Sequence, residues 1–62
     1  MPEGGYIIKF IDRKTKETEL IPLRLFGDML LLLEEFEKDN IPYILIKVAS
    51  NKEYNMIADA IA

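Results

Sequence analysis

The absence of both cysteine and histidine is the feature that most constrains this chain, because the chain is only 62 residues long. A domain of this length buries only about 60% of the surface that its unfolded form exposes, so its stability is marginal. Natural domains of this size are commonly stabilised by disulfides, by a structural metal or by a second subunit. Without cysteine there is no disulfide and no thiolate metal site, and without histidine the commonest transition-metal ligand is missing. A dense core or oligomerisation therefore remains.

The composition indicates one folded domain over residues 1–62. Apolar residues make up 50% of the chain, which excludes intrinsic disorder as the default. The net charge of −3 argues against nucleic acid and anionic membranes as partners. The longest apolar run, residues 29–33, is far shorter than the roughly 20 residues that cross a bilayer. The first residues lack the basic segment of a signal peptide. We therefore predict a cytoplasmic domain that does not bind membranes, with residues 1–5 as a flexible arm.

The pattern of apolar residues predicts a ββαβα order of elements. Residues 6–11 are rich in β-branched and aromatic side chains, as strands are, residues 17–21 resume an extended pattern, and residues 43–48 are predicted as the third strand. A helical period follows Phe26, with Asp28 as a plausible N-cap and Asn40 as the residue that closes the helix. Residues 23–27 fit either the end of the second strand or the start of this helix. A capping box at residues 50–53 then begins a short C-terminal helix.

The predicted fold class is a small α+β domain with a three-stranded, mainly antiparallel sheet. Pro22 cannot donate to a sheet ladder, so the second strand is expected at an edge and the first strand in the middle, in the order 2-1-3. One long helix packs on a face of this sheet. Tyr6, Ile8 and Phe10 are assigned to that face, and the third strand is expected to contribute three more residues to it: Ile44, Ile46 and Val48.

More apolar side chains remain than one helix on one face can bury. The opposite sheet face carries Ile7 and Ile11, and is expected to carry Tyr43 and Leu45 with them. On the long helix, Leu31 points away from the predicted core stripe and Leu32 lies at its flank. We interpret these six residues as a candidate protein interface, with self-association into a homodimer as the leading hypothesis. In the alternative interpretation the C-terminal helix folds back over the second face.

No combination of side chains predicts catalysis or a cofactor. Ser50 is the only serine and has no histidine to activate it, so a helix N-cap is the simpler role. The acidic run at residues 34–39 is that of a solvated helix face. Gly4 and Gly5 precede a strand rather than a helix, so they do not form a phosphate-binding loop. We expect a non-enzymatic protein with no cofactor, no metal and no small-molecule substrate.

A basic cluster at the tip of the hairpin carries the second functional hypothesis. Arg13, Lys14 and Lys16 fall in the turn, and a β-ribbon can enter the major groove of DNA. Glu17 and Glu19 follow directly, and lysine-rich turns are also common as solvated ends of sheets. Nucleic-acid binding is therefore the alternative function, and protein–protein interaction with a regulatory role is the leading one.

Overall fold

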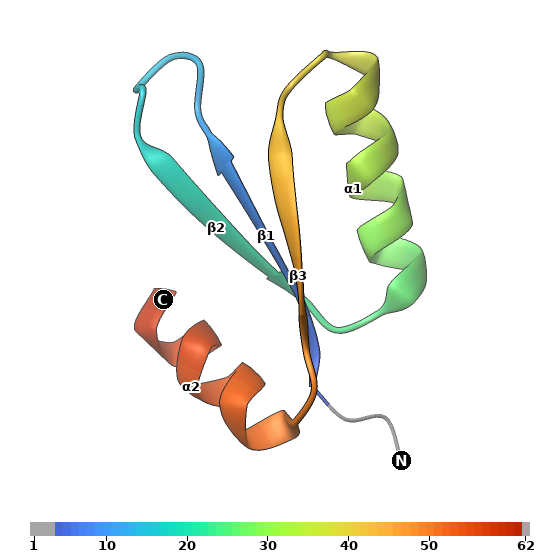
Figure 1. Ribbon diagram of the computed structural model, residues 1–62, viewed down its shortest axis with the longest axis vertical. Helices are drawn as coiled ribbons and strands as arrows, with labels where there is room; N and C mark the ends of the chain where they lie inside the picture. The colour runs from blue at the N-terminus through green and yellow to red at the C-terminus, as the bar shows by residue number, and fades with distance from the viewer. Residues whose placement is uncertain (1–3, 62) are drawn as a thin grey trace.

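The computed structural model describes residues 4–61 and confirms the ββαβα order. Its elements are β1 (Gly5–Ile11), β2 (Thr18–Leu23), α1 (Phe26–Lys38), β3 (Tyr43–Val48) and α2 (Asn51–Ile61). The strands form one antiparallel sheet in the order β2-β1-β3, as predicted (Figure 1). Residues 1–3 of the predicted arm lie outside the described residues. Gly4 and Gly5 are buried, and Gly5 already pairs with Val48.

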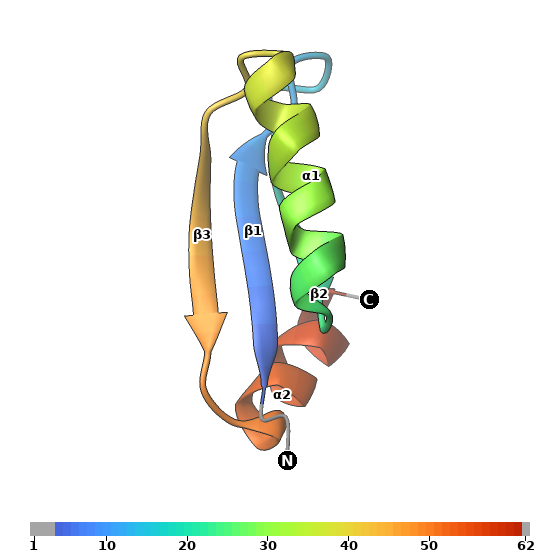
Figure 2. The same ribbon diagram turned by 90° about the vertical axis from the view of Figure 1, so that its right-hand side faces the viewer.

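The two helices cover opposite faces of the sheet. α1 packs along β1 and β2, where Met29 and Phe36 meet the fully buried Ile8. α2 crosses the other face near the C-terminal end of β3, where Tyr54 packs on Ile7 and Val48. Figure 2 shows that α1 stands over β1 and β2 while β3 lies apart from it, at the margin of the molecule. The last helix therefore covers part of the second face, and β3 is the least covered strand.

The face assignment predicted for β3 is wrong by one residue. Antiparallel pairing sets Ile8 opposite Leu45 and Ile7 opposite Ile46, and residues directly opposite share a face. Leu45 therefore lies on the α1 side. Tyr43 lies there too, because it packs against the core cluster of Ile8, Met29 and Phe36, here called the α1 cluster. Ile44, Ile46 and Val48 lie on the α2 side with Ile7. The prediction aligned the uncharged face of each strand, but the pairing register places Lys9 and Lys47 on opposite faces.

The hairpin turn is built from a hydrogen-bonded aspartate rather than from an Asn-Gly pair. The Asp12 carboxylate accepts hydrogen bonds from the backbone N–H groups of Lys14 (2.7 Å) and Thr15 (3.1 Å). Lys16 adopts a positive φ of 64°, and its N–H donates to the Asp12 carbonyl. This left-handed residue supplies the bend that closes the loop between Ile11 and Thr18.

α1 begins without a side-chain cap and ends as predicted. Its N-cap is Leu25, and Asp28 lies inside the first turn, where its charge faces the positive end of the helix dipole. The predicted cap at Asp28 is therefore wrong, because the N-cap residue lies three positions earlier, at Leu25. At the other end Asn40 takes φ 57°, and the Ile41 N–H donates to the Phe36 carbonyl in a Schellman arrangement.

α2 is anchored by its first two turns. The Ser50 hydroxyl accepts a hydrogen bond from the Glu53 N–H at 3.1 Å, which confirms its predicted capping role. The guanidinium of Arg24 lies 4.2 Å from the centre of the Tyr54 ring and donates to the side-chain oxygens of Asn51 and Asn55. The start of β1 passes so close to Tyr54 that a Cβ on Gly5 would lie 2.8 Å from the ring. Only glycine permits this approach.

Candidate protein-interaction surface

The outer edge of β3 is the open edge of the sheet. Within residues 4–61, β3 pairs with β1 alone, so the backbone N–H and C=O groups along its other side are free to pair. The opposite edge, β2, contains Pro22, which cannot donate to a further strand, and α2 packs against β2. β3 has no proline within it and only one charged residue, Lys47. Lys47 is therefore the only one of the usual protective features, charge or proline, within this edge strand.

Three consecutive apolar side chains are exposed on this strand. Ile44 is 58% exposed, Leu45 39% and Ile46 42%. We call these three residues the β3 edge patch. Because successive residues alternate between faces, Leu45 is exposed on the α1 side while both isoleucines are exposed on the α2 side. The strand is therefore apolar on both faces as well as unpaired along its edge.

α1 carries a second group of exposed apolar side chains. Leu31 is 64% exposed, whereas Leu32 is half buried against the α1 cluster. Leu31 borders a shallow surface that is lined by apolar residues of β2 and α1 and by three carboxylates, those of Asp28, Glu34 and Glu35. Phe26 (58% exposed) and Leu30 (44%) are exposed on α1 as well, so the helix offers a second apolar surface.

The remaining candidate interface residues have different environments. Ile7 is 2% exposed and belongs to the core beneath α2, so it is not available on the surface of the protein. Ile11, at the end of β1, is 59% exposed. The structure thus brings Ile11 and Leu45 to the surface and places Ile7 in the interior. Ile44 and Ile46 were not among the predicted residues, because the strand pattern had assigned them to the face covered by α1.

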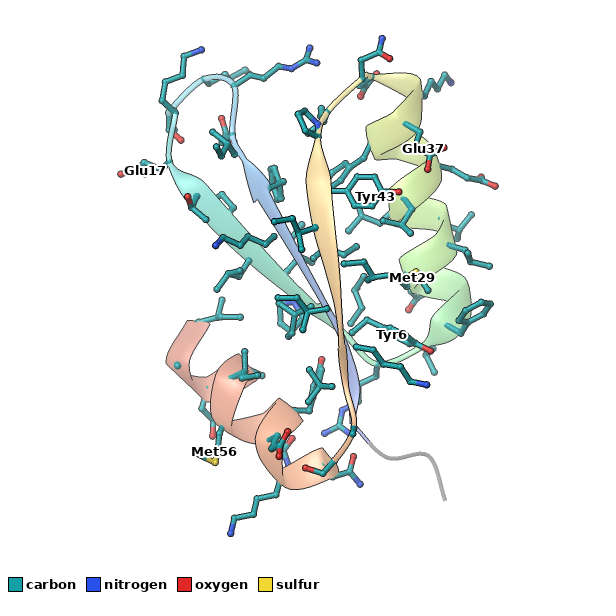
Figure 3. The ribbon with its side chains drawn as sticks, in the orientation of Figure 1. Tyr6, Glu17, Met29, Glu37, Tyr43 and Met56 are labelled. Atoms are coloured by element: carbon teal, nitrogen blue, oxygen red, sulfur yellow. The ribbon has the colours of Figure 1, made fainter. Side chains whose placement is uncertain are left out.

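Tyr43 joins the start of β3 to α1 through a polar contact. Its hydroxyl donates to the Glu37 carboxylate at 2.9 Å, and its ring lies against Phe36 with the centroids 6.0 Å apart. Figure 3 shows the Tyr43 and Glu37 side chains side by side between β3 and α1. The hydrogen bond to Glu37 raises the pKa of Tyr43, because ionising the phenol would place two negative charges together. This pair leaves a carboxylate at the end of the exposed strand.

The basic residues of the hairpin tip are not equally available. The Arg13 guanidinium donates to the backbone carbonyls of Asp39 and Asn40, each at 2.7 Å. It therefore holds the hairpin against the C-terminal end of α1, where a cation is favoured. Lys14 and Lys16 are exposed. The Thr15 and Lys14 backbone N–H groups lower the pKa of Asp12, which keeps its charge among these lysines.

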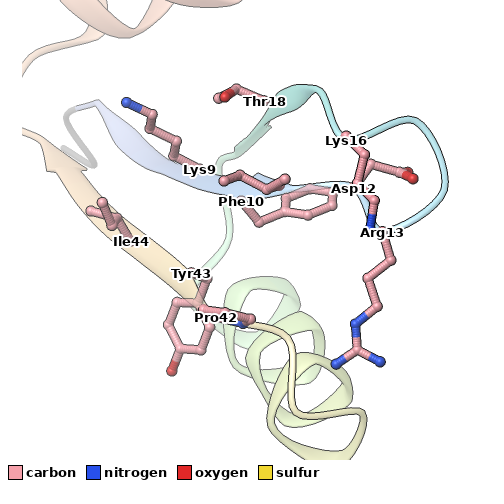
Figure 4. Close-up of a pocket in the computed structure, with 10 residues that line it drawn as sticks. Lys9, Phe10, Asp12, Arg13, Lys16, Thr18, Pro42, Tyr43 and Ile44 are labelled. Carbon is pink, nitrogen blue, oxygen red and sulfur yellow. The ribbon is translucent and has the colours of Figure 1, made fainter.

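A hollow of about 580 Å³ lies at the end of the sheet away from α2 (Figure 4). Ile11, Pro42 and Ile44 supply apolar lining, and Lys9, Arg13 and Lys16 surround it. The hollow is continuous with the β3 edge patch through Ile44. Among residues 4–61 no polar or charged residue is buried, so the polar side chains around the hollow are all at least partly exposed.

The comparisons with known proteins give no relative: no family model, curated protein or solved structure matches the chain. Among residues 4–61, no group of three acidic side chains is arranged to hold a metal ion. Neither of the two helices in this part of the chain is long and apolar enough to cross a membrane. The β3 edge, which is unpaired and apolar on both faces, is the surface feature from which a function is proposed below.

Proposed function

We propose that this protein is a non-enzymatic protein-interaction domain that acts as a homodimer through the β3 edge. The observation that carries the proposal is the combination of an unpaired strand edge with apolar side chains exposed on both of its faces. Such an edge is a template for another strand, and natural monomers usually block it with charge, proline or a bulge. A second copy offers the same edge, and twofold dimers are the commonest assembly.

The energetic gain from covering the patch is moderate. The exposed fractions of Ile44, Leu45 and Ile46 correspond to between one and one and a half fully buried side chains in each copy. Burying them contributes about 2–4 kcal/mol per copy. Association of two proteins costs roughly 4–15 kcal/mol in lost freedom, and new backbone hydrogen bonds add to the gain. We therefore expect a dimer that dissociates on dilution.

The test is the solution mass from light scattering over a concentration series, with three glutamate variants. Ile44→Glu would bury a carboxylate at the pairing edge, while in the monomer it stands opposite Lys9, which favours the folded state. Met56→Glu is the matched control, because Met56 is 63% exposed and points away from the sheet on α2 (Figure 3). Leu31→Glu tests the helix surface instead.

We expect a concentration-dependent mass up to twice that of one chain for the unmodified protein, for Met56→Glu and for Leu31→Glu. Ile44→Glu should remain monomeric at every concentration. A monomer for the unmodified protein would contradict the proposal. So would a dimer that dissociates with Leu31→Glu and survives Ile44→Glu, since its interface would then lie on α1.

A further inference from the structure

The geometry of an antiparallel pair limits how two copies of β3 can meet, if the proposed dimer is accepted as the starting point. A twofold axis that relates two neighbouring antiparallel strands must be perpendicular to the sheet. Each residue of one copy is then directly opposite a residue of the other copy whose side chain lies on the same face of the sheet. Three registers satisfy this near the centre of β3, with the axis at Ile44, at Leu45 or at Ile46.

The three registers differ in the side chains that they bring together. With the axis at Leu45, each Ile44 faces Ile46 of the second copy and the two Leu45 side chains face each other, so the whole β3 edge patch is matched. An axis at Ile46 places Leu45 opposite Lys47. An axis at Ile44 places Ile46 opposite Pro42, which cannot donate to the ladder. The register centred on Leu45 is therefore the one that matches the whole β3 edge patch with itself and keeps Lys47 and Pro42 from facing it.

The same register sets Lys47 directly opposite Tyr43 of the second copy. Both residues lie on the α1 side of the sheet, since Lys47 pairs with Tyr6 and Tyr43 with Phe10. Directly opposite Cβ atoms are about 4.5–5.5 Å apart, so the lysine stem can run along the tyrosine ring. The Glu37 carboxylate lies at the end of that ring, 2.9 Å from the Tyr43 hydroxyl oxygen. The positive charge of one copy thus meets the negative charge of the other, twice in each dimer.

Neither of the two helices in the described part of the chain obstructs this approach. α1 packs on β1 and β2 and leaves β3 at the margin (Figure 2). α2 lies at the Val48 end of β3, so the twofold axis places the two copies of α2 at opposite ends of the paired strands. The two Lys47 residues are four positions apart along the strands, about 13 Å, so their mutual repulsion is largely screened at physiological salt.

We propose that two copies pair their β3 strands about a twofold axis at Leu45, forming a continuous six-stranded sheet in which Lys47 of each copy binds the Glu37–Tyr43 pair of the other. The partner is thus a second copy of this chain, and each copy completes the polar site of the other. α1 helices then lie on one face of the joined sheet and α2 helices on the other.

Single-cysteine variants test this register, because the chain has no native cysteine. Leu45→Cys, Ile44→Cys and Ile46→Cys are each oxidised mildly and separated on a non-reducing gel. A disulfide needs Cα atoms about 4.4–6.8 Å apart, which directly opposite residues satisfy and residues offset by two do not. We expect a covalent dimer from Leu45→Cys alone, and a mixed dimer when Ile44→Cys and Ile46→Cys are combined.

Other cross-linking results distinguish the two proposals. A covalent dimer from Ile46→Cys or Ile44→Cys alone would overturn the Leu45 register and leave a β3-mediated homodimer standing. No cross-link from any of the three variants, in a protein that still dimerises, would overturn both proposals. The Ile44→Glu variant then gives independent evidence, because a mass unchanged by that substitution shows that the β3 edge is not the interface.

A charge exchange tests the contact between copies. Lys47→Glu should weaken dimerisation about 2- to 10-fold, as expected for two partly exposed ion pairs. Adding Glu37→Lys to the same chain should restore it, because the exchanged charges meet again across the axis. Within one copy Lys47 lies about 13 Å along the strand from Tyr43, so the recovery reports on contact between copies. A double variant as weak as the single one would overturn the contact.

Discussion

Replacing Tyr54 tests whether α2 is held on the sheet mainly by one aromatic side chain. Tyr54 is 6% exposed and packs on Ile7 and Val48, and Arg24 stacks on its outer face. Truncating a buried aromatic residue to alanine costs about 3–5 kcal/mol. A domain of this length has a total stability of roughly 3–9 kcal/mol. Tyr54→Ala should therefore lose between a third of its stability and all of it, and α2 should detach first.

The assay is urea unfolding followed by circular dichroism at one fixed protein concentration. For a small domain the free energy of unfolding falls by about 1 kcal/mol per M urea, so a loss of 3 kcal/mol lowers the midpoint by about 3 M. Tyr54→Phe is the matched control. The side-chain hydrogen bonds found among residues 4–61 do not include the Tyr54 hydroxyl, so this variant should shift the midpoint by less than about 0.5 M.

Tyr54→Leu extends the series if the alanine variant does not fold. It keeps an apolar side chain of smaller area and should fall between the other two variants. A midpoint for Tyr54→Ala within about 0.5 M of the unmodified protein would refute the reasoning, because α2 could not then depend on this ring. A lower slope of the unfolding curve, in contrast, would indicate that α2 has already separated and that less surface remains to be exposed.

Two further predictions concern glycine positions and alkaline pH. Gly5→Ala should destabilise the fold by about 1–3 kcal/mol, because its Cβ would lie 2.6 Å from the Leu23 carbonyl oxygen. Gly27→Ala should instead stabilise α1 by about 0.5–1 kcal/mol, because its Cβ meets no atom within 4 Å. Equal thermal unfolding midpoints for the two variants would contradict this packing. The raised pKa of Tyr43 means that the folded state holds this proton more tightly, so the stability that it contributes is fully present below the ordinary value of 10.0 and is lost as the pH rises through the folded pKa. Glu37→Gln should lower that pKa in a tyrosinate absorbance titration, and a titration unchanged by this substitution would show that the hydrogen bond does not control it.

The order of elements was predictable because each one is marked by local chemistry. Pro22 identified β2 as an edge strand, Asn40 the end of α1 and Ser50 the start of α2, and all three assignments agree with the structure. The start of α1 was not predictable in the same way. No side chain caps it, and the apolar Leu25 is its N-cap residue. A helix end held by tertiary packing leaves no capping residue to recognise.

The sequence also predicted a surplus of apolar surface, but it misplaced the surface. The prediction depended on which side of β3 faces α1, and that choice is fixed by the register between β3 and β1. Because side chains alternate along a strand, an error of one residue exchanges the two faces. Ile44 and Ile46 were therefore assigned to the core, although they are 58% and 42% exposed.

What this sequence determined by itself is the identity of its elements and the need for cover beyond one helix. Composition, proline positions and the lack of cysteine and histidine are local properties, and they suffice for that. Only the tertiary structure decided that α2 covers Ile7 and that the Arg13 guanidinium is hydrogen-bonded to backbone carbonyls at the end of α1. It also decided that the apolar side chains of β3 are exposed. Each of these depends on contacts between residues far apart in the chain, and the free energy of such contacts is set by register and packing rather than by the residue types alone.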